Sequence, residues 1–181
     1  MKVHDTSLPD VKVLEPQVFA DGRGFFLESY NKRTFAEAVG FTDEFVQDNH
    51  SRSSKNILRG LHYQLENVQG KLLRVVTGTI YDVVVDMRKS SPAFGKWAAF
   101  TLSSEKHTLL WVPPGFAHGF LVVSDYADVL YKTTNFYDPL SERCLIWNDP
   151  DLKIPWPIKG EPLISSKDSQ GKKLKDLEAY P

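Results

Sequence analysis

Short runs of apolar residues, many alternating with polar ones, recur along the chain from residue 45 onward, with turn residues between them. Alternation of this kind is typical of strands that bury one face. Because no helical segments come between these runs, the pattern favours an antiparallel barrel or sandwich. The predicted strands cover residues 45–50, 58–64, 71–76, 80–86, 96–102, 108–112, 118–123, 128–136 and 143–147.

The stretch Thr77-Gly78-Thr79 between two of these runs has the form of a compact hairpin turn. Before residue 45, extended segments are predicted at 11–19 and 25–30, joined by the turn Asp21-Gly22-Arg23-Gly24. A short helix is expected at 31–39, with a glycine directly after it to end it.

The chain has 181 residues, of which 41% are hydrophobic, enough apolar material for a sizeable core in one domain. We expect an N-terminal arm at about 1–44, a barrel at about 45–148 and a C-terminal tail at about 149–181. The formal net charge of -1 lacks the positive excess that is typical of nucleic-acid-binding proteins. An anionic ligand would therefore need a local cluster of Arg and Lys.

Cys144 is the single cysteine, so no intramolecular disulfide is possible. It falls in an apolar run, where we expect a core position rather than a reactive thiol. Residues 1–10 lack the apolar run of a signal peptide, and no stretch of about 18 consecutive apolar residues occurs. We therefore expect a cytoplasmic protein with no membrane span.

Successive side chains on a strand point to opposite faces, which sorts the residues of two predicted strands. Tyr131 shares a face with Val129 and is therefore expected inside. Lys71 shares a face with Leu73 and Val75, so its ammonium is expected in an apolar interior. A buried ammonium needs an anionic partner or a polarised oxygen, because its desolvation is costly.

Two histidines occur in similar surroundings on predicted strands, His62 in the motif RGLHYQ and His118 in PPGFAHGF. We expect both to point into one cavity of a small barrel. Strand alternation places Arg59 on the face opposite His62. Both can serve one ligand only if the strand bulges at Gly60 or if Arg59 reaches around the rim.

The residues alone leave three uses open for these histidines. Each can be a hydrogen-bonded core histidine. A metal site would need further ligands, but Tyr63 and Gln64 follow His62 and neither is a usual one. Proton transfer is the third use, because imidazole titrates near neutral pH.

A proton-transfer site would combine His62 with three other residues. A carboxylate on the second ring nitrogen would hold the tautomer, and Asp168 is the candidate. The phenol of Tyr131 can protonate a basic carbanion or enolate, and Lys71 can hold an enolate oxygen.

Candidates for binding an anionic or hydroxylated ligand are scattered along the chain. Basic side chains that could bind a diphosphate are Arg23, Arg59 and Lys167. Side chains that could hydrogen-bond to hydroxyls are Glu28, Gln47, Asp48 and Asn49. Taken singly, each basic residue is more often a solvated surface charge, and each of the other residues is weak evidence for a binding site.

The run Phe45-Val46-Gln47-Asp48-Asn49-His50-Ser51, followed by RGLHYQ, resembles the dTDP-4-dehydrorhamnose 3,5-epimerase family. The likeness spans nearly the whole chain, and the two histidine motifs together are specific. Further matches, in order, are Asp21-Gly22-Arg23-Gly24-Phe25-Phe26, Gly70-Lys71-Leu72, Val84-Val85-Asp86-Met87-Arg88, Ser91-Pro92, Gly95, Trp97, PPGFAHGF, Tyr131, Tyr137, Glu142, Asp149-Pro150-Asp151-Leu152 and Ser166-Lys167-Asp168.

The resemblance implies an all-β cupin, a double-stranded β-helix jelly-roll barrel with short helices at the periphery and no metal or other cofactor. It implies a homodimer, without nucleic-acid or membrane partners, that acts on dTDP-4-dehydro-6-deoxy-D-glucose in dTDP-L-rhamnose biosynthesis. The position of the family's base is His62, supported by Asp168, and that of its acid is Tyr131. The matches to its substrate-binding residues are Arg23, Phe26, Glu28, Gln47, Asp48, Asn49, Arg59, Lys71, His118, Glu142 and Lys167.

Proton removal next to a C4 ketone, with return from the opposite face, would use the same residues whether C3 and C5 are both inverted or only one is. A 5-epimerase or a 3-epimerase of a related dTDP-keto-deoxysugar is therefore the near alternative. A non-catalytic nucleotide-sugar-binding cupin and a metal-dependent oxygenase or isomerase are more distant alternatives.

Overall fold

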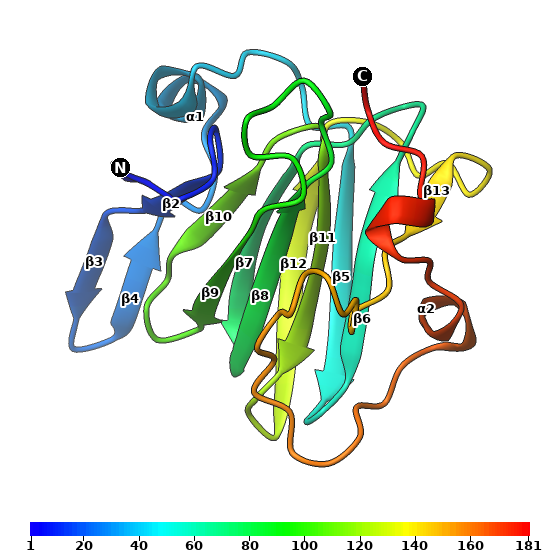
Figure 1. Ribbon diagram of the computed structural model, residues 1–181. Helices are drawn as coiled ribbons and strands as arrows, with labels where there is room; N and C mark the ends of the chain where they lie inside the picture. Colours follow the sequence, from blue (N-terminus) through cyan, green and yellow to red (C-terminus); the bar gives the residue numbers. More distant parts are fainter.

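Two antiparallel sheets face each other in the computed structural model, which describes residues 1–181 (Figure 1). In the order β1-β2-β10-β7-β12-β5, the six-stranded sheet contains Lys2–Asp5, Lys12–Glu15, Leu109–Val112, Lys71–Thr77, Tyr126–Thr133 and Gln47–Ser54. In the order β13-β6-β11-β8-β9, the five-stranded sheet contains Glu142–Cys144, Leu58–Gln64, Phe116–Val122, Thr79–Asp86 and Trp97–Ser103. The remaining elements are β3 (Val18–Asp21), β4 (Gly24–Leu27), α1 (Lys32–Val39), α2 (Ser166–Ser169) and the 3-10 helix η1 (Leu174–Asp176).

The main core lies between the two sheets. Leu73 and Val129 from the six-stranded sheet belong to one buried cluster with Val84 and Phe120 from the five-stranded sheet. Apolar side chains on alternate positions of both sheets therefore remove their inner faces from water. The all-β jelly-roll architecture predicted from the sequence is confirmed.

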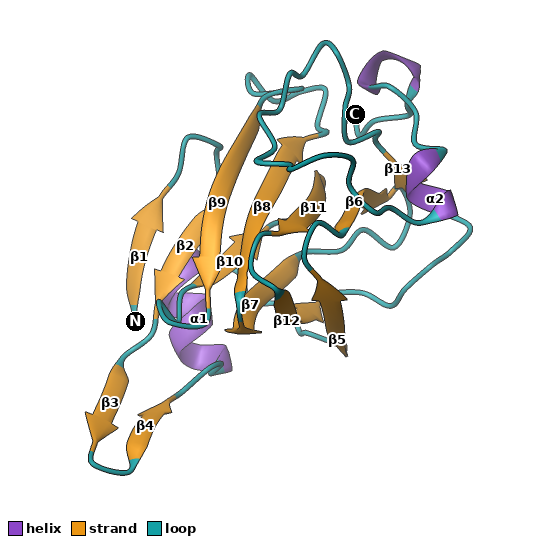
Figure 2. Ribbon diagram, turned by 90° about the horizontal axis from the view of Figure 1, so that it is seen from below, coloured by secondary structure: helices purple, strands orange, loops and turns teal.

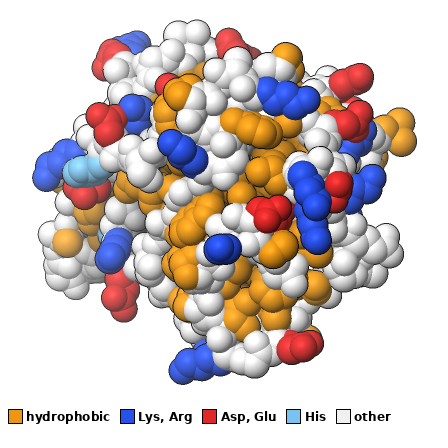
Figure 3. Space-filling view, viewed as in Figure 1, with side chains coloured by type: hydrophobic (Ala, Val, Ile, Leu, Met, Phe, Trp, Pro, Cys, Tyr) orange, Lys and Arg blue, Asp and Glu red, His pale blue; other side chains and the backbone are white.

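The C-terminal tail covers the outer face of the five-stranded sheet, where a second cluster includes Leu61, Tyr63 and Leu152. Tyr180 packs against the ring of Tyr63, with ring centroids 5.8 Å apart, and its backbone N–H donates to Met87. Figure 3 shows hydrophobic side chains partly visible between charged ones on this face of the molecule. The tail is thus packed against the barrel rather than loose.

Helix α1 covers the outer face of the six-stranded sheet and confirms the helix predicted at 31–39. The side chain of Asn31 caps it by accepting from the backbone N–H groups of Arg33 and Thr34. Gly40 ends it in the left-handed conformation. Its buried Phe35 packs edge-on against Trp111 of β10. No helix of the structure has the length and apolar character needed to cross a membrane.

The hairpin predicted around Thr77-Gly78-Thr79 is wrong. β7 pairs with β10 and β12, whereas β8 pairs with β9 and β11, so the chain passes from one sheet to the other at Gly78. A short glycine connection fits both a hairpin and a sheet crossover, and only the partners of the two strands distinguish them.

The segment expected as an arm contributes to the six-stranded sheet, because β2 pairs with β10. The outermost strand, β1, was not predicted, since all four of its side chains are exposed and no apolar pattern marks it. Its pairing with β2 extends the sheet at an edge.

A bulge in β6 resolves the placement of Arg59. His62 is opposite His118 in the pairing of β6 with β11, and Arg59 is opposite Phe120, so two residues of β6 match one of β11. The extra residue returns Arg59 to the same face as His62. Gly60, within the bulge, has a φ of +107°, a conformation that L side chains rarely adopt.

We expect the substitution Gly60→Ala to destabilise the fold. A Cβ atom at this position would lie 2.6 Å from the backbone oxygen of His118. The unfavourable φ alone costs about 1–3 kcal/mol. Chemical denaturation should show the free energy of unfolding lowered by at least this amount.

Gly22→Ala is the matched control, because no atom lies within 4 Å of a Cβ atom built there. Its free energy of unfolding should change by less than about 0.5 kcal/mol. Equal stability of the two variants would contradict the role assigned to the bulge.

Candidate active site

A cavity of about 660 Å³ lies between the two sheets. Strands β5, β7 and β12 line one side, and β6, β11 and β13 line the other together with segment 163–168. The predicted catalytic residues His62, Tyr131 and Asp168 all line it. So do the predicted binding residues Gln47, Asn49, Arg59, Lys71 and His118. Glu142 and Lys167 complete the set of predicted residues in this cavity.

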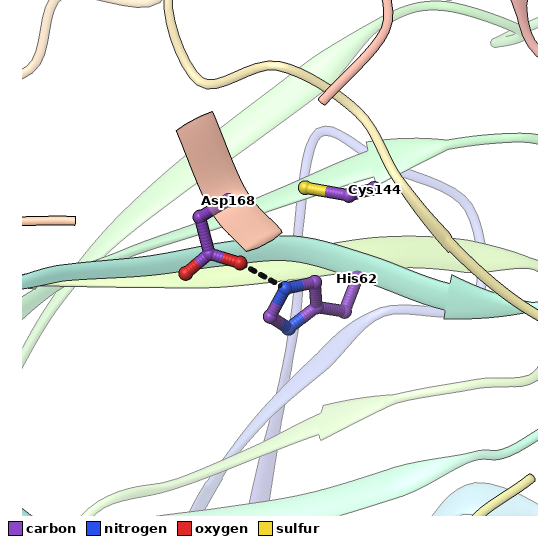
Figure 4. Close-up of side chains that lie close together, drawn as sticks. All are labelled: His62, Cys144 and Asp168. Atoms are coloured by element: carbon purple, nitrogen blue, oxygen red, sulfur yellow. Dashed lines mark hydrogen bonds and ion pairs between the residues drawn. The ribbon is translucent and has the colours of Figure 1, made fainter. Parts of the chain in front are cut away.

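His62 and Asp168 form a hydrogen-bonded pair, with Nε2 of the imidazole 2.5 Å from Oδ1 of the carboxylate (Figure 4). The other carboxylate oxygen accepts a 3.4 Å hydrogen bond from the backbone N–H of Gly60. Burial acts to raise the pKa of Asp168, but its contacts with His62, Ser165 and Gly60 together lower it below the usual value. Asp168 is therefore ionised at neutral pH.

The short helix α2 brings Asp168 to β6. Ser165 caps this helix by accepting a 3.1 Å hydrogen bond from the backbone N–H of Asp168. The segment before it is attached to the barrel, because Leu58 donates a 3.0 Å backbone hydrogen bond to Leu163. A serine cap within the segment and a short parallel bridge between Leu163 and Ile57, which are far apart in the sequence, thus set the position of the carboxylate.

An ionised Asp168 sets the tautomer of His62. Nε2 carries the hydrogen and donates it to the carboxylate, which leaves the lone pair on Nδ1. Nδ1 makes no hydrogen bond and lies 4.0 Å from Oε1 of Glu142, another residue of the cavity. His62 can therefore accept a proton at Nδ1 from a molecule in the cavity.

Glu142 on β13 holds two further cavity residues. In the pairing of β13 with β6, Glu142 is opposite Gln64, so its side chain lies on the same face of the sheet as His62. Its Oε2 accepts a 2.8 Å hydrogen bond from the hydroxyl of Tyr137 and contacts the ammonium of Lys167. The carboxylate thus orients one aromatic and one cationic side chain at the cavity.

Lys71 is buried, as strand alternation predicted. Its Nζ donates a 3.3 Å hydrogen bond to the backbone oxygen of His62. Burial lowers the pKa of Lys71 to about 8, and the charges of Glu142 and Asp82 oppose this shift. At neutral pH the ammonium is still mostly protonated and can stabilise negative charge in the cavity.

His118 belongs to a second histidine–carboxylate pair, with Nε2 lying 2.8 Å from Oδ2 of Asp82. Asp82 is fully buried. Burial raises its pKa, and the charges of His118 and Lys71 oppose that shift. Asp82 was not predicted as a site residue, although its position on the same strand face as the core residues Ile80 and Val84 indicates a buried carboxylate.

Tyr131 lines the same cavity as His62 but from the opposite sheet, since β12 lies in the six-stranded sheet and β6 in the five-stranded one. It packs against the main core, as its alternation with Val129 predicted. Burial raises the pKa of its phenol above the usual value, and the nearby Arg59 opposes this shift. Arg59 is itself oriented by a 2.8 Å hydrogen bond from its Nε to the hydroxyl of Ser53. Ser53 is buried and was not predicted as a site residue.

Asp48 does not join the other predicted residues of β5. Gln47 and Asn49 line the cavity and are linked by a 2.9 Å hydrogen bond between their side chains. Asp48 lies on the opposite face, where Lys132 donates a 2.9 Å hydrogen bond to it. Strand alternation therefore places Gln47 and Asn49 on one face of the sheet and Asp48 on the other.

Arg23, Phe26 and Glu28 also lie outside the cavity of their own chain. Strands β3 and β4 form a hairpin that projects from the body of the protein (Figure 2). The side chain of Arg23 is 90% exposed and pairs with Asp21, and Phe26 is 69% exposed. Glu28, just after β4, accepts a 3.2 Å hydrogen bond from Asn31.

Cys144 lies beside the candidate base rather than within one of the hydrophobic clusters. It pairs with His62 across β13 and β6, and its Sγ lies within 4.8 Å of ligand atoms of His62 and Asp168 (Figure 4). Burial, followed by the charge of Asp168, raises the pKa of its thiol to about 12, so it is protonated at neutral pH.

Known proteins resemble this chain over its full length. The curated dTDP-4-dehydrorhamnose 3,5-epimerase of Pseudomonas aeruginosa is 55% identical over 181 residues, which is 100% of each chain. That of Shigella flexneri is 55% identical over 99% of each chain. The crystal structure of a 3,5-epimerase from Legionella pneumophila, in complex with dTDP-4-keto-L-rhamnose, has a TM-score of 0.96 and 45% identity, covering 98% of this chain and 94% of the other.

The family model described as dTDP-4-dehydrorhamnose 3,5-epimerase matches residues 5–176. This range contains every residue predicted for the site. The chain belongs to the dTDP-4-dehydrorhamnose 3,5-epimerase family.

Proposed function

We propose that this protein inverts C3 and C5 of dTDP-4-dehydro-6-deoxy-D-glucose to give dTDP-4-dehydro-L-rhamnose. The observation that carries this proposal is the arrangement of one cavity. A histidine oriented by a buried carboxylate lines one side, a half-buried tyrosine lines the other, and a buried lysine also lines the cavity. Inversion needs a base and an acid on opposite faces of the sugar ring, and this arrangement supplies both.

The C4 ketone makes the hydrogens at C3 and C5 acidic. Nδ1 of His62 removes one of these protons, and Asp168 stabilises the imidazolium that forms. The electrons of the broken C–H bond move to the C4 oxygen as an enolate. Lys71 stabilises that oxygen, because its ammonium carries positive charge inside a cavity of low dielectric.

Tyr131 returns a proton to carbon from the other face. A phenol whose pKa is raised by burial remains protonated at neutral pH. It is a weak acid, but an enolate carbon is basic enough to take its proton, and transfer from the face opposite His62 inverts the centre. Before the next inversion, the tyrosinate takes a proton from solvent and the imidazolium of His62 releases its proton to solvent, so both groups return to their starting states.

The nucleotide diphosphate serves as a handle remote from the reacting carbons. Arg59 and Lys167 supply positive charge in the cavity, and Gln47 and Asn49 supply hydrogen bonds. Binding energy from these groups holds the sugar between base and acid.

The active protein is a homodimer in which the β3–β4 hairpin of each chain reaches the cavity of the other. The exposed aromatic side chains Phe19, Phe25 and Phe26 on this hairpin support an interface there. The same contact accounts for the positions of Arg23 and Glu28, which are remote from the cavity of their own chain. In the dimer these residues bind the partner's nucleotide.

Inversion at one carbon only is the second candidate. A 3'-monoepimerase from Streptomyces bikiniensis, solved with dTDP-quinovose, has a TM-score of 0.90 and 34% identity to this chain. The base and acid chemistry is common to both reactions, so the same fold can support either outcome.

The deciding experiment is the reaction with dTDP-4-dehydro-6-deoxy-D-glucose in D2O, followed by proton NMR. We expect deuterium at both C3 and C5 and inverted configuration at both. His62→Ala should lower the exchange rate by about 10² to 10⁴, the usual contribution of a general base, with nucleotide binding retained.

His50→Ala is the matched control, because His50 makes a similar contact with a carboxylate, Asp128, but does not line the cavity. It should exchange both positions like the unaltered protein. Deuterium at one carbon only would favour the monoepimerase, and binding without any exchange would favour a non-catalytic cupin.

Tyr131→Phe should separate exchange from inversion. Without the phenol, His62 still removes a proton and returns deuterium to the same face, so label enters with retained configuration. Inverted product should form about 10² to 10⁴ times more slowly. Tyr126→Phe, at the exposed start of the same strand, should leave both rates unchanged. Parallel loss of exchange and inversion in Tyr131→Phe would remove the acid role from this residue.

The proposed site, made of the cavity of one chain and the β3–β4 hairpin of its partner, can be tested by mixing two inactive variants of the chain. A hybrid of an Arg23→Ala/Phe26→Ala chain with a His62→Ala chain should regain one intact site, because one cavity and the other hairpin are both unaltered. A hybrid of His62→Ala with Tyr131→Phe is the control. Both changes then lie in the cavities, so neither site is repaired. Equal activity of the two hybrids would contradict a hairpin that acts on the partner chain.

A further inference from the structure

Cys144 has no part in the proton-transfer scheme, although it lies next to the base. β13 pairs it directly with His62, so both side chains leave the sheet on the same face. One ligand atom from each of Cys144, His62 and Asp168 lies within 4.8 Å of the other two (Figure 4). Cys144 is not among the residues that line the substrate cavity.

We propose that these three side chains form a binding site for a soft divalent cation, Zn²⁺ or Cd²⁺. The bound cation inhibits the reaction, because it prevents His62 from accepting a proton. A thiolate, an imidazole and a carboxylate form a donor set that suits zinc and its heavier analogue, whereas Mg²⁺ prefers oxygen ligands alone. The two positive charges of the cation would be matched by the thiolate of Cys144 and the carboxylate of Asp168. Solvent would occupy the fourth ligand position.

The geometry needs only small adjustments. In a tetrahedral site with a Zn–S distance of about 2.3 Å and Zn–N and Zn–O distances of about 2.0 Å, donor atoms lie about 3.3–3.5 Å apart. The His62–Asp168 contact of 2.5 Å would lengthen by less than about 1 Å, and the sulfur would move closer. Asp168 lies on the four-residue helix α2, and Cys144 lies on β13, a three-residue strand at the edge of its sheet, so both ligands come from short elements outside the centre of the sheets.

Protons must leave for this site to form. The thiol releases its proton to solvent, since only the thiolate is a good ligand. At His62 the cation takes the lone pair of Nε2, and the hydrogen that Nε2 held moves to Nδ1. Nδ1 is the atom that accepts the substrate's proton in the proposed reaction. A cation bound at Nε2 therefore blocks the base without occupying the substrate's place.

The inhibitory effect depends on the proposed function, but the binding itself does not, so binding is measured first. Cd²⁺ is added to the nucleotide-free protein while the near-ultraviolet charge-transfer absorption of a cadmium thiolate is recorded, with calorimetry for affinity. We expect one Cd²⁺ per chain with a thiolate band. Epimerase exchange, assayed after incubation with Cd²⁺, should be lost and should return when EDTA is added. Mg²⁺ should have no effect in either assay.

Cys144→Ser separates this site from the other histidine–carboxylate pairs of the chain. This variant should exchange deuterium like the unaltered protein and should lack the thiolate band. Its affinity for Cd²⁺ should fall by more than ~10- to 100-fold, which is the usual effect of losing a residue that only supports a metal ligand. If Cys144→Ser folds poorly in thermal melts, Cys144→Ala replaces it. Equal sensitivity of the serine variant to Cd²⁺, or binding without a thiolate band, would overturn the proposal. A band and stoichiometric binding with no epimerase activity in any sample would instead count against the proposed function alone.

Discussion

The hydrogen bond between Asp168 and His62 joins the tail of the chain to the middle of the barrel, across 106 residues of sequence. The orientation of the imidazole depends on this contact, and the contact depends on where the tail packs. At the end of the tail, Tyr180 packs against the ring of Tyr63. Before α2, the backbone oxygen of Leu163 accepts a hydrogen bond from Leu58 at the start of β6. Apolar burial on the outer face of one sheet therefore holds the carboxylate that orients this imidazole inside the barrel.

The interior of the barrel combines an apolar core with a small set of charged groups. Asp82 is fully buried near Lys71 and His118, and the charges of these two residues offset part of its desolvation cost, as its own charge does for Lys71. An isolated charge at any of these positions would be strongly unfavourable. The negative charge of Asp82 therefore helps a cavity between two hydrophobic sheets to keep a positively charged lysine in its interior.

The two sheets also separate the two residues that we propose as base and acid. His62 belongs to one sheet and Tyr131 to the other, so a sugar ring between the sheets meets a different residue on each face. A close approach of β6 and β11 at Gly60 and Gly119 then turns Arg59 toward the same space. The jelly roll thus supplies the opposed faces, and the bulge supplies the cation beside them.

Local pattern determined much of this protein: the strands, the capped helix α1, the burial of Lys71 and the inward direction of Tyr131 all follow from periodicity and end signals in neighbouring residues. The roles of the site residues were assigned with the help of the motif resemblance. Asp82 and Ser53 were not predicted, because a single polar residue in a strand has no local signature. Only the tertiary structure decided that β7 and β8 join different sheets, that Asp48 and the β3–β4 hairpin lie outside the cavity, and that Cys144 adjoins His62. These are pairings between distant segments, and they depend on which strands share hydrogen bonds, a choice made by the packing of the whole chain.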